Sequence, residues 1–150
     1  MFAPRPDVAT SEMLRVLKPG GAIAFSTWPP ELFTGRMFAL VSSFMPPPPP
    51  GVSPPPQWGD ANTVRERLGN KVKDIFFRRG TMSVPALSPQ HSRTGIERTA
   101  GPVLKLVELL SATDPARLEE FRRAYETLVA DHIEENLVRQ DYLMTRATKA

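Results

Sequence analysis

The segment from residue 7 to residue 28 constrains the fold more than any other part of the chain. Asp7–Leu17 reads as a short helix with Asp7 as its N-cap. Lys18–Gly21 ends that helix, because Pro cannot continue a helix and Gly accepts a positive φ angle. Ala22–Trp28 is almost wholly apolar and predicts a strand buried on both faces, as in parallel α/β sheets.

The rest of the chain alternates between helical and strand patterns. The clearest pattern lies over Asp114–Leu137, where apolar residues spaced by three and four form one stripe after an Asp-Pro start. Further helices are predicted over residues 31–44, 60–69, 88–99 and 101–110, and further strands over residues 71–84 and 141–149. Three strands among about six helices predict an α/β fold.

Composition bounds the class of protein. A chain of 150 residues, 41% hydrophobic and 23% charged, is long enough for one globular domain with a core. The absence of cysteine excludes disulfides, thiolate metal sites and a cysteine nucleophile. No run approaches the ~18 apolar residues of a membrane span, and the N-terminus lacks a signal-peptide core. We therefore expect a soluble, cytoplasmic protein.

The charge distribution argues against nucleic acid as the main partner. The net charge is +3, with 8 Lys and Arg against 6 Asp and Glu up to residue 75, and 11 against 10 after it. Cations alternate with acids, as in residues 117–123, whereas nucleic-acid-binding proteins usually gather their cations on one face.

Proline is concentrated in one segment. Eight of the 17 prolines lie between Pro46 and Pro56. Such a segment could dock an SH3-type domain as a polyproline II ligand, or it could be a stiff connector. We favour the connector, because Phe44, Met45 and Trp58 flank the segment and would tie it to the fold.

The residues Glu12–Gly21, followed by Ala22–Trp28, resemble a segment of class I S-adenosylmethionine-dependent methyltransferases, of the type 11 or ubiquinone/menaquinone-biosynthesis group. Asp141–Lys149 resembles the last, antiparallel strand of that fold. The resemblance implies the C-terminal part of a Rossmann-like methyltransferase fold, with a three-stranded mixed sheet in the family order five, seven, six. Asp141–Lys149 would then lie between Ala22–Trp28 and residues 72–79.

The resemblance also implies a single partial domain. Residues 1–87 would hold the first elements and the proline-rich loop 45–59, residues 88–138 a lid-like helical insertion, and residues 139–150 the final strand.

S-adenosylmethionine would be the cofactor. The chain has no G-x-G-x-G motif, and Gly20-Gly21 lies between a helix and a strand, the reverse of a phosphate loop. The cofactor half of such an enzyme would precede Met1, so we expect poor cofactor binding and no activity in the isolated chain.

The acceptor side of the site is the part that this chain would supply. Thr27 and Trp28 end a strand at its carboxyl end, where open α/β sheets bind ligands, although Trp28 could equally pack against the next helix. His91 is a weak candidate for a general base, and no confident catalytic, cofactor-binding or metal-binding residue is found. The predicted substrate-pocket residues are Phe2, Thr27, Trp28, Arg36, Met37 and His91.

A second hypothesis is a non-catalytic remnant or regulatory protein. Without strands on its far side, Ala22–Trp28 would lie at an open sheet edge, and such edges recruit other chains. The expected partners are then a second copy or a chain that supplies the missing half. The methyl acceptor stays open between quinone, sterol, small acid and protein.

Overall fold

The computed structural model describes residues 2–150, which divide into two compact units. Unit 1 comprises the chain up to Leu32, Pro48–Thr81 and Asp141–Ala150. Unit 2 comprises Phe33–Pro47 and Met82–Gln140. Each unit has its own apolar core.

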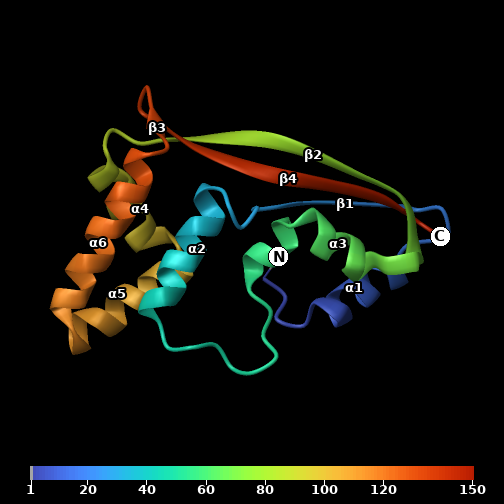
Figure 1. Cartoon of the computed structure of the whole chain (residues 1–150), viewed down its shortest axis with the longest axis horizontal. Helices are drawn as coiled ribbons and strands as arrows, with labels where there is room; N and C mark the ends of the chain where they lie inside the picture. The colour runs from blue at the N-terminus through green and yellow to red at the C-terminus, as the bar shows by residue number, and fades with distance from the viewer. Residues whose placement is uncertain (1) are drawn as a thin grey trace. The chain divides into compact units, whose positions relative to one another are not determined.

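Unit 1 is built on three long strands. β1 (Ala22–Thr27) pairs antiparallel with β4 (Leu137–Lys149), in a register that runs from Ala22↔Thr148 to Thr27↔Leu143. β2 (Val72–Pro85) lies on the other side of β4, so the order is β1-β4-β2 (Figure 1). The C-terminal strand is therefore the central strand of the sheet.

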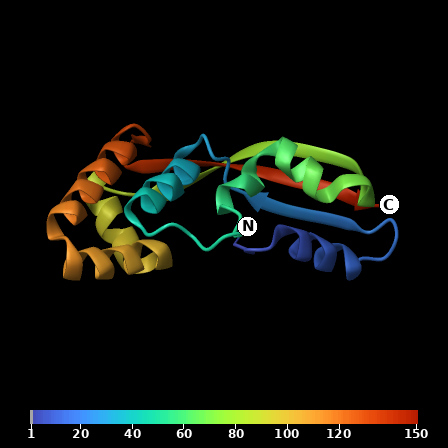
Figure 2. The same cartoon turned by 60° about the horizontal axis from the view of Figure 1, so that its bottom comes forward.

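Two helices cover one face of this sheet. α1 (Pro6–Arg15) and α3 (Ala61–Leu68) both lie below the strands in Figure 1, and in Figure 2 α3 is drawn across β2 and β4 while α1 lies below β1. The 3-10 turns η1 (Pro55–Gly59) and η2 (Gly69–Lys71) directly precede and follow α3. The core of unit 1 consists of Leu14, Ile23, Trp58, Val64, Leu68, Val72 and Ala147.

Asp74 sets which residues of β2 face that core. Its φ angle of 52° interrupts the two-residue alternation of the strand, as a β-bulge does. Val72, Ile75 and Phe77 consequently all pack into the core of unit 1, whereas Phe76 is 59% exposed.

Unit 2 is helical. Its helices are α2 (Phe33–Phe44), α4 (Pro89–Thr99), α5 (Gly101–Thr113) and α6 (Pro115–Ala130). Ser88 and Asp114 cap α4 and α6 by accepting hydrogen bonds from the His91 and Arg117 backbone amides. The core is centred on the fully buried Phe121, Tyr125, Val103 and Leu106.

The α/β class and six α-helices within residues 2–150 agree with expectation, but the expected three-stranded mixed sheet is wrong. The described residues form a four-stranded antiparallel sheet. The additional strand, β3 (Ile133–Glu134), pairs with the start of β4. All pairs are antiparallel because β4 returns between β1 and β2.

The same hairpin shortens the helix that was expected to reach Leu137. α6 ends at Ala130, and Glu135 and Asn136 turn the chain with φ angles of 49° and 62°. Two successive positive φ angles match a two-residue type I′ turn, which suits the twist of a hairpin. The apolar spacing through Ile133 and Leu137 is therefore shared by a helix and a strand pair, and only the turn residues distinguish them.

The proline-rich segment has anchors on both sides. The Ser53 amide donates a hydrogen bond to the Pro4 carbonyl at 3.3 Å, and Trp58 is 3% exposed in the core of unit 1. Phe44 and Met45 pack against the core of unit 2. These contacts are those of a tethered connector. Among the described residues, no helix is long and apolar enough to span a membrane.

The hairpin turn yields a stability prediction. Replacing Glu135-Asn136 by Asn-Gly should stabilise the protein by about 0.5–1 kcal/mol, because Gly and Asn adopt positive φ angles at lower cost than Glu. Urea unfolding followed by circular dichroism measures the change. The control Glu134→Gly places glycine in a strand position of the same hairpin and should destabilise. A stabilising effect of both variants would contradict the turn assignment.

Candidate functional site

The carboxyl end of β1 carries an aromatic wall. The rings of Trp28 and Tyr142 meet edge-to-face, with centroids 6.2 Å apart and planes at 90°. They follow directly on the pairing of Thr27 with Leu143, so the antiparallel register itself brings them together. Both side chains are half-buried and present apolar surface beside the strand end.

Close packing fixes the position of this strand end. The Thr27 hydroxyl donates to the Trp58 carbonyl at 2.7 Å, and Thr27 is 2% exposed. A Cβ on Gly59 would lie 2.1 Å from the Trp28 carbonyl oxygen, so only glycine fits at residue 59. η1 is thereby held directly against the backbone of Trp28.

Tyr142 is held in the same way from β2. A Cβ on Gly80 would lie 2.5 Å from the Tyr142 ring, so the glycine leaves the space that the ring occupies. The Thr81 hydroxyl donates a hydrogen bond to the Asp141 carboxylate beside it. Arg79 and Glu31 form an exposed ion pair at 2.9 Å, also in unit 1.

Trp58 and Arg67 form a second aromatic contact in unit 1. The Arg67 guanidinium lies 4.6 Å from the Trp58 ring and donates to Ser53 Oγ at 2.6 Å and Gln57 Oε1 at 3.0 Å. Burial lowers the pKa of Arg67, and among the described residues its Nη1 has no hydrogen-bond partner. Arg67 also lines an open hollow of about 480 Å³, which is mixed in charge and formed by Pro6, Asp7, Val8, Ser11, Glu12, Glu66 and Lys71.

The predicted pocket residues divide between the units. Phe2, Thr27 and Trp28 belong to unit 1, and Arg36, Met37 and His91 belong to unit 2. Phe2 is 65% exposed, and Thr27 is buried with its hydroxyl engaged, so Trp28 is the member of the first group that forms the wall.

In unit 2, Arg36 lines a shallow hollow of about 190 Å³, together with Leu40, Ala124, Thr127, Leu128 and Asp131. Met37 packs against the core of that unit. The hollow combines one cation and one carboxylate with apolar and hydroxyl groups. Met37 thus has a packing role, whereas Arg36 is exposed at the surface.

His91 serves the start of α4. Its Nδ1 accepts a hydrogen bond from the Leu87 amide at 3.0 Å, and its own amide donates to Ser88 Oγ at 3.1 Å. A neutral imidazole that accepts at Nδ1 carries its proton on Nε2. The exposed nitrogen is then a donor, which does not suit the role of general base.

Unit 2 also contains a connected set of ion pairs between α4 and α6. Glu97 pairs with Arg93 and Arg122, both at 2.9 Å, and Arg93 pairs with Glu126 at 2.6 Å. Burial alone would raise the pKa of Glu97, but hydrogen bonds and charges from Arg122 and Arg93 outweigh it and lower that pKa. The hydrogen bonds that Arg122 donates to the Glu97 carboxylate raise the pKa of Arg122. These groups neutralise one another and hold the two helices together.

The glycine turn before β1 does not fit a cofactor cradle. The Gly20 amide donates to the Lys149 carbonyl at 3.1 Å, and the Lys149 amide donates to the Gly21 carbonyl at 2.8 Å. The Gly21 amide donates to the Lys18 carbonyl at 2.8 Å. The backbone of this turn is therefore occupied by β4 and by the turn itself. Within residues 2–150, no cluster of His, Asp and Glu could hold a metal ion.

Sequence analysis did not identify Tyr142 as a site residue. The signal was present in the antiparallel placement of the last strand. Pairing residues 141–149 with residues 22–28 in reverse order puts Tyr142 next to Trp28 once Thr27 faces Leu143. The register itself could not be obtained from the sequence, because several offsets keep alternating residues on one face.

Comparison with known proteins yields relatives without an assigned activity. No protein-family model matches the chain. The chain is 28% identical to "Uncharacterized protein Rv1405c" and 27% identical to "Uncharacterized protein Rv1403c", both of Mycobacterium tuberculosis. It is 28% identical to "Uncharacterized protein Mb1440c" of Mycobacterium bovis. Each match covers 99% of this chain and 54% of the relative, so the chain spans about half the length of these relatives.

The Thr27 hydrogen bond provides a test of the strand end. Thr27→Val should destabilise the protein by about 1–3 kcal/mol, because the buried Trp58 carbonyl loses its donor without a change in side-chain shape. Ser26→Ala, at the exposed neighbouring position, should change stability by less than about 0.5 kcal/mol. Urea unfolding monitored by tryptophan fluorescence measures both, and equal effects would contradict the assigned role of Thr27.

Because of the ion pairs of Glu97, we expect the free energy of unfolding to decrease at acidic pH. Because its pKa in the folded state lies below the ordinary 4.5, the stabilisation is complete above that value and is lost as pH falls through the folded-state pKa. Glu97→Gln should cost about 1.5–3 kcal/mol at pH 7 and flatten the loss of stability below about pH 4.5. Denaturant titrations at several pH values test this, with the exposed Glu108→Gln as control. An unchanged acid slope in Glu97→Gln would contradict it.

Proposed function

We propose that this chain forms the acceptor-substrate side of an S-adenosylmethionine-dependent methyltransferase, with the cofactor-binding residues outside these 150 residues. The main support is the segment that runs from α1 through the Lys18–Gly21 turn into β1, together with the pairing of β1 to the C-terminal strand. The resemblance to class I methyltransferases requires these elements in this order. The pairing of the Gly20-Gly21 turn with Lys149 supports a structural role for these glycines.

The aromatic wall of Trp28 and Tyr142 suits the binding of a methyl acceptor. Methyl transfer depends mainly on aligning the acceptor with the methyl group and on excluding water. Trp28, at the end of β1, and Tyr142, within β4, offer two perpendicular aromatic surfaces, which favour a planar, largely apolar acceptor. No side chain of the wall is a strong base, so the acceptor group we expect is one that needs little help to lose a proton.

The length of the mycobacterial relatives is compatible with this division. This chain spans 54% of each of them, which leaves a comparable length for a cofactor-binding part in those proteins. The Gly20-Gly21 turn, whose backbone is paired with Lys149 and Lys18, is not available as the cofactor loop of such a part.

One observation favours a second candidate function, association through the edge of β1. β1 ends the strand order in unit 1, and its exposed residues Ala22, Ala24 and Ser26 are small and uncharged. Neither Lys nor Pro occurs within the strand to discourage pairing with another chain. A non-catalytic protein could use this edge to bind a second copy.

A chimera tests the methyltransferase proposal. This chain would replace the matched region of the relative Rv1405c, and calorimetry with S-adenosylmethionine would be run on the relative, the chimera and the isolated chain. We expect dissociation constants in the range of roughly 1–100 μM for the first two proteins and no measurable binding for the third. Trp28→Ala in the chimera should leave cofactor affinity within about threefold, since the wall is assigned to the acceptor.

Two results would contradict the proposal. If the relative itself does not bind the cofactor, the family assignment fails for both proteins. If the isolated chain binds it with micromolar affinity, the cofactor site lies within these residues. A dimer of the isolated chain that dissociates in Ala24→Lys, combined with no cofactor binding by the relative, would instead favour the second candidate.

A further inference from the structure

Arg67, in the last turn of α3, is a half-buried cation that has no acidic side chain within ion-pair distance among residues 2–150. Its hydrogen bonds go to neutral oxygen atoms of Ser53 and Gln57. Removing a charge from water without an opposite charge costs free energy, and for that reason burial lowers the pKa of Arg67. Arg67 is therefore held by neutral groups and not by an ion pair.

These neutral groups belong to the end of the proline-rich segment, which Arg67 fastens to α3. Nη2 of Arg67 donates to Ser53 Oγ at 2.6 Å and to Gln57 Oε1 at 3.0 Å. Ser53 Oγ in turn donates to Gln57 Oε1 at 2.7 Å, so the three side chains form a closed set. The guanidinium also lies 4.6 Å from the centre of the Trp58 ring, as a cation–π contact. One side chain thus restrains Ser53, Gln57 and Trp58 together.

Trp58 and Gly59 connect this turn to the end of β1. The Trp58 carbonyl accepts the hydrogen bond of the buried Thr27 hydroxyl at 2.7 Å. The next residue, Gly59, packs so closely against the Trp28 backbone that a Cβ has no room there. The backbone of Thr27 and Trp28 is therefore supported by the same turn, residues 53–59, that α3 holds in place.

We propose that Arg67 is a positioning residue of the aromatic wall, which acts through residues 53–59 on the backbone of Trp28. The perpendicular contact of Trp28 with Tyr142 depends on where that backbone lies. The cation–π contact of Arg67 is made with Trp58 and not with the wall, so its effect on the wall is indirect. The use of the wall by an acceptor rests on the function proposed above, whereas the positioning itself does not.

Fluorine NMR on the 150-residue chain labelled with 5-fluorotryptophan tests the positioning. The chain has two tryptophans, so the variant Trp28→Phe assigns both lines. Arg67→Met removes the guanidinium and keeps an unbranched stem. We expect it to shift or broaden the Trp28 line and to weaken the nuclear Overhauser effects between the Trp28 and Tyr142 rings. Arg67→Lys should give a smaller change, because it keeps the charge but lacks the planar group that stacks on Trp58.

Two control variants separate positioning from general destabilisation. Arg65→Met removes another arginine of α3, whose guanidinium lies 4.7 Å from the Phe77 ring, and should leave the Trp28 line unchanged. Val129→Ala lowers stability through the core of unit 2, where Val129 is fully buried, and should also leave that line unchanged. Circular dichroism and urea unfolding confirm that each variant is folded.

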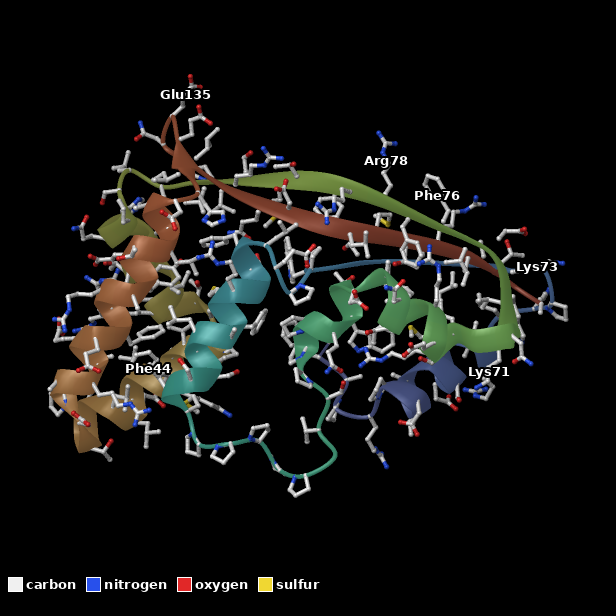
Figure 3. All side chains as sticks on the ribbon, in the orientation of Figure 1. Phe44, Lys71, Lys73, Phe76, Arg78 and Glu135 are labelled. Atoms are coloured by element: carbon white, nitrogen blue, oxygen red, sulfur yellow. The ribbon has the colours of Figure 1, made fainter. Side chains whose placement is uncertain are left out.

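Titration with 2-naphthol, a planar and largely apolar probe, separates the positioning from the proposed function. We expect the wild type to bind it with a dissociation constant of roughly 0.1–5 mM, and Arg67→Met at least about threefold more weakly. Phe76 is 59% exposed and projects from β2 on the side away from α1 and α3 (Figure 3). Phe76→Ala should change the affinity by less than about twofold, which excludes binding to exposed aromatic surface in general.

The outcomes distinguish the two proposals. An unchanged Trp28 line in Arg67→Met, or an equal change of that line in Val129→Ala, would overturn the positioning role. Measurable and equal affinities of the wild type and Arg67→Met for 2-naphthol would overturn it as well. A changed Trp28 line in Arg67→Met, with no binding of 2-naphthol by the wild type, would support the positioning role and contradict the acceptor role of the wall.

Discussion

The antiparallel pairing of β4 with β1 is the interaction on which the rest of unit 1 depends. It joins two segments that are far apart in the sequence, from Ala22↔Thr148 to Thr27↔Leu143, and it places Ile23, Thr27 and their partners on the core side. Because side chains alternate in strands, the same register exposes Ala24 and Arg146 on the other side. A shift of one residue would exchange the two faces and bury a charged arginine against α1 and α3.

The register also builds the aromatic wall. Trp28 and Tyr142 meet because Trp28 follows Thr27 and Tyr142 precedes Leu143, the last pair of the β1–β4 register, and two glycines permit that meeting. Gly59 allows η1 to approach the Trp28 backbone, and Gly80 leaves room for the Tyr142 ring. If the wall aligns a planar acceptor, as proposed, rigid placement by backbone contact is an advantage, since little motion remains to be restrained on binding.

Strong local signals made part of this structure predictable. The Pro-Gly-Gly turn, the apolar run after it and the Asp-Pro start of α6 each act within a few residues, and each element begins where the sequence indicates. β3 and the end of α6 could not be predicted, because Ile133 and Leu137 fit a helix as well as a hairpin. That choice is made by Glu135 and Asn136, whose positive φ angles carry a weak sequence signal without glycine. Of the candidate site, Trp28 was predictable from its place at a strand end, whereas Tyr142 depended on a register set by tertiary packing.

The two faces of the sheet therefore carry different chemistry on the same strands. In β4, Ala147 belongs to the core that α1 and α3 cover and Leu143 is buried, while Tyr142, Met144 and Arg146 belong to the alternating set on the opposite face. The aromatic wall lies on the side that α1 and α3 leave uncovered. The register that buries Ile23 and Ala147 therefore also places Tyr142 beside Trp28, and a change of register would lose the core and the wall together.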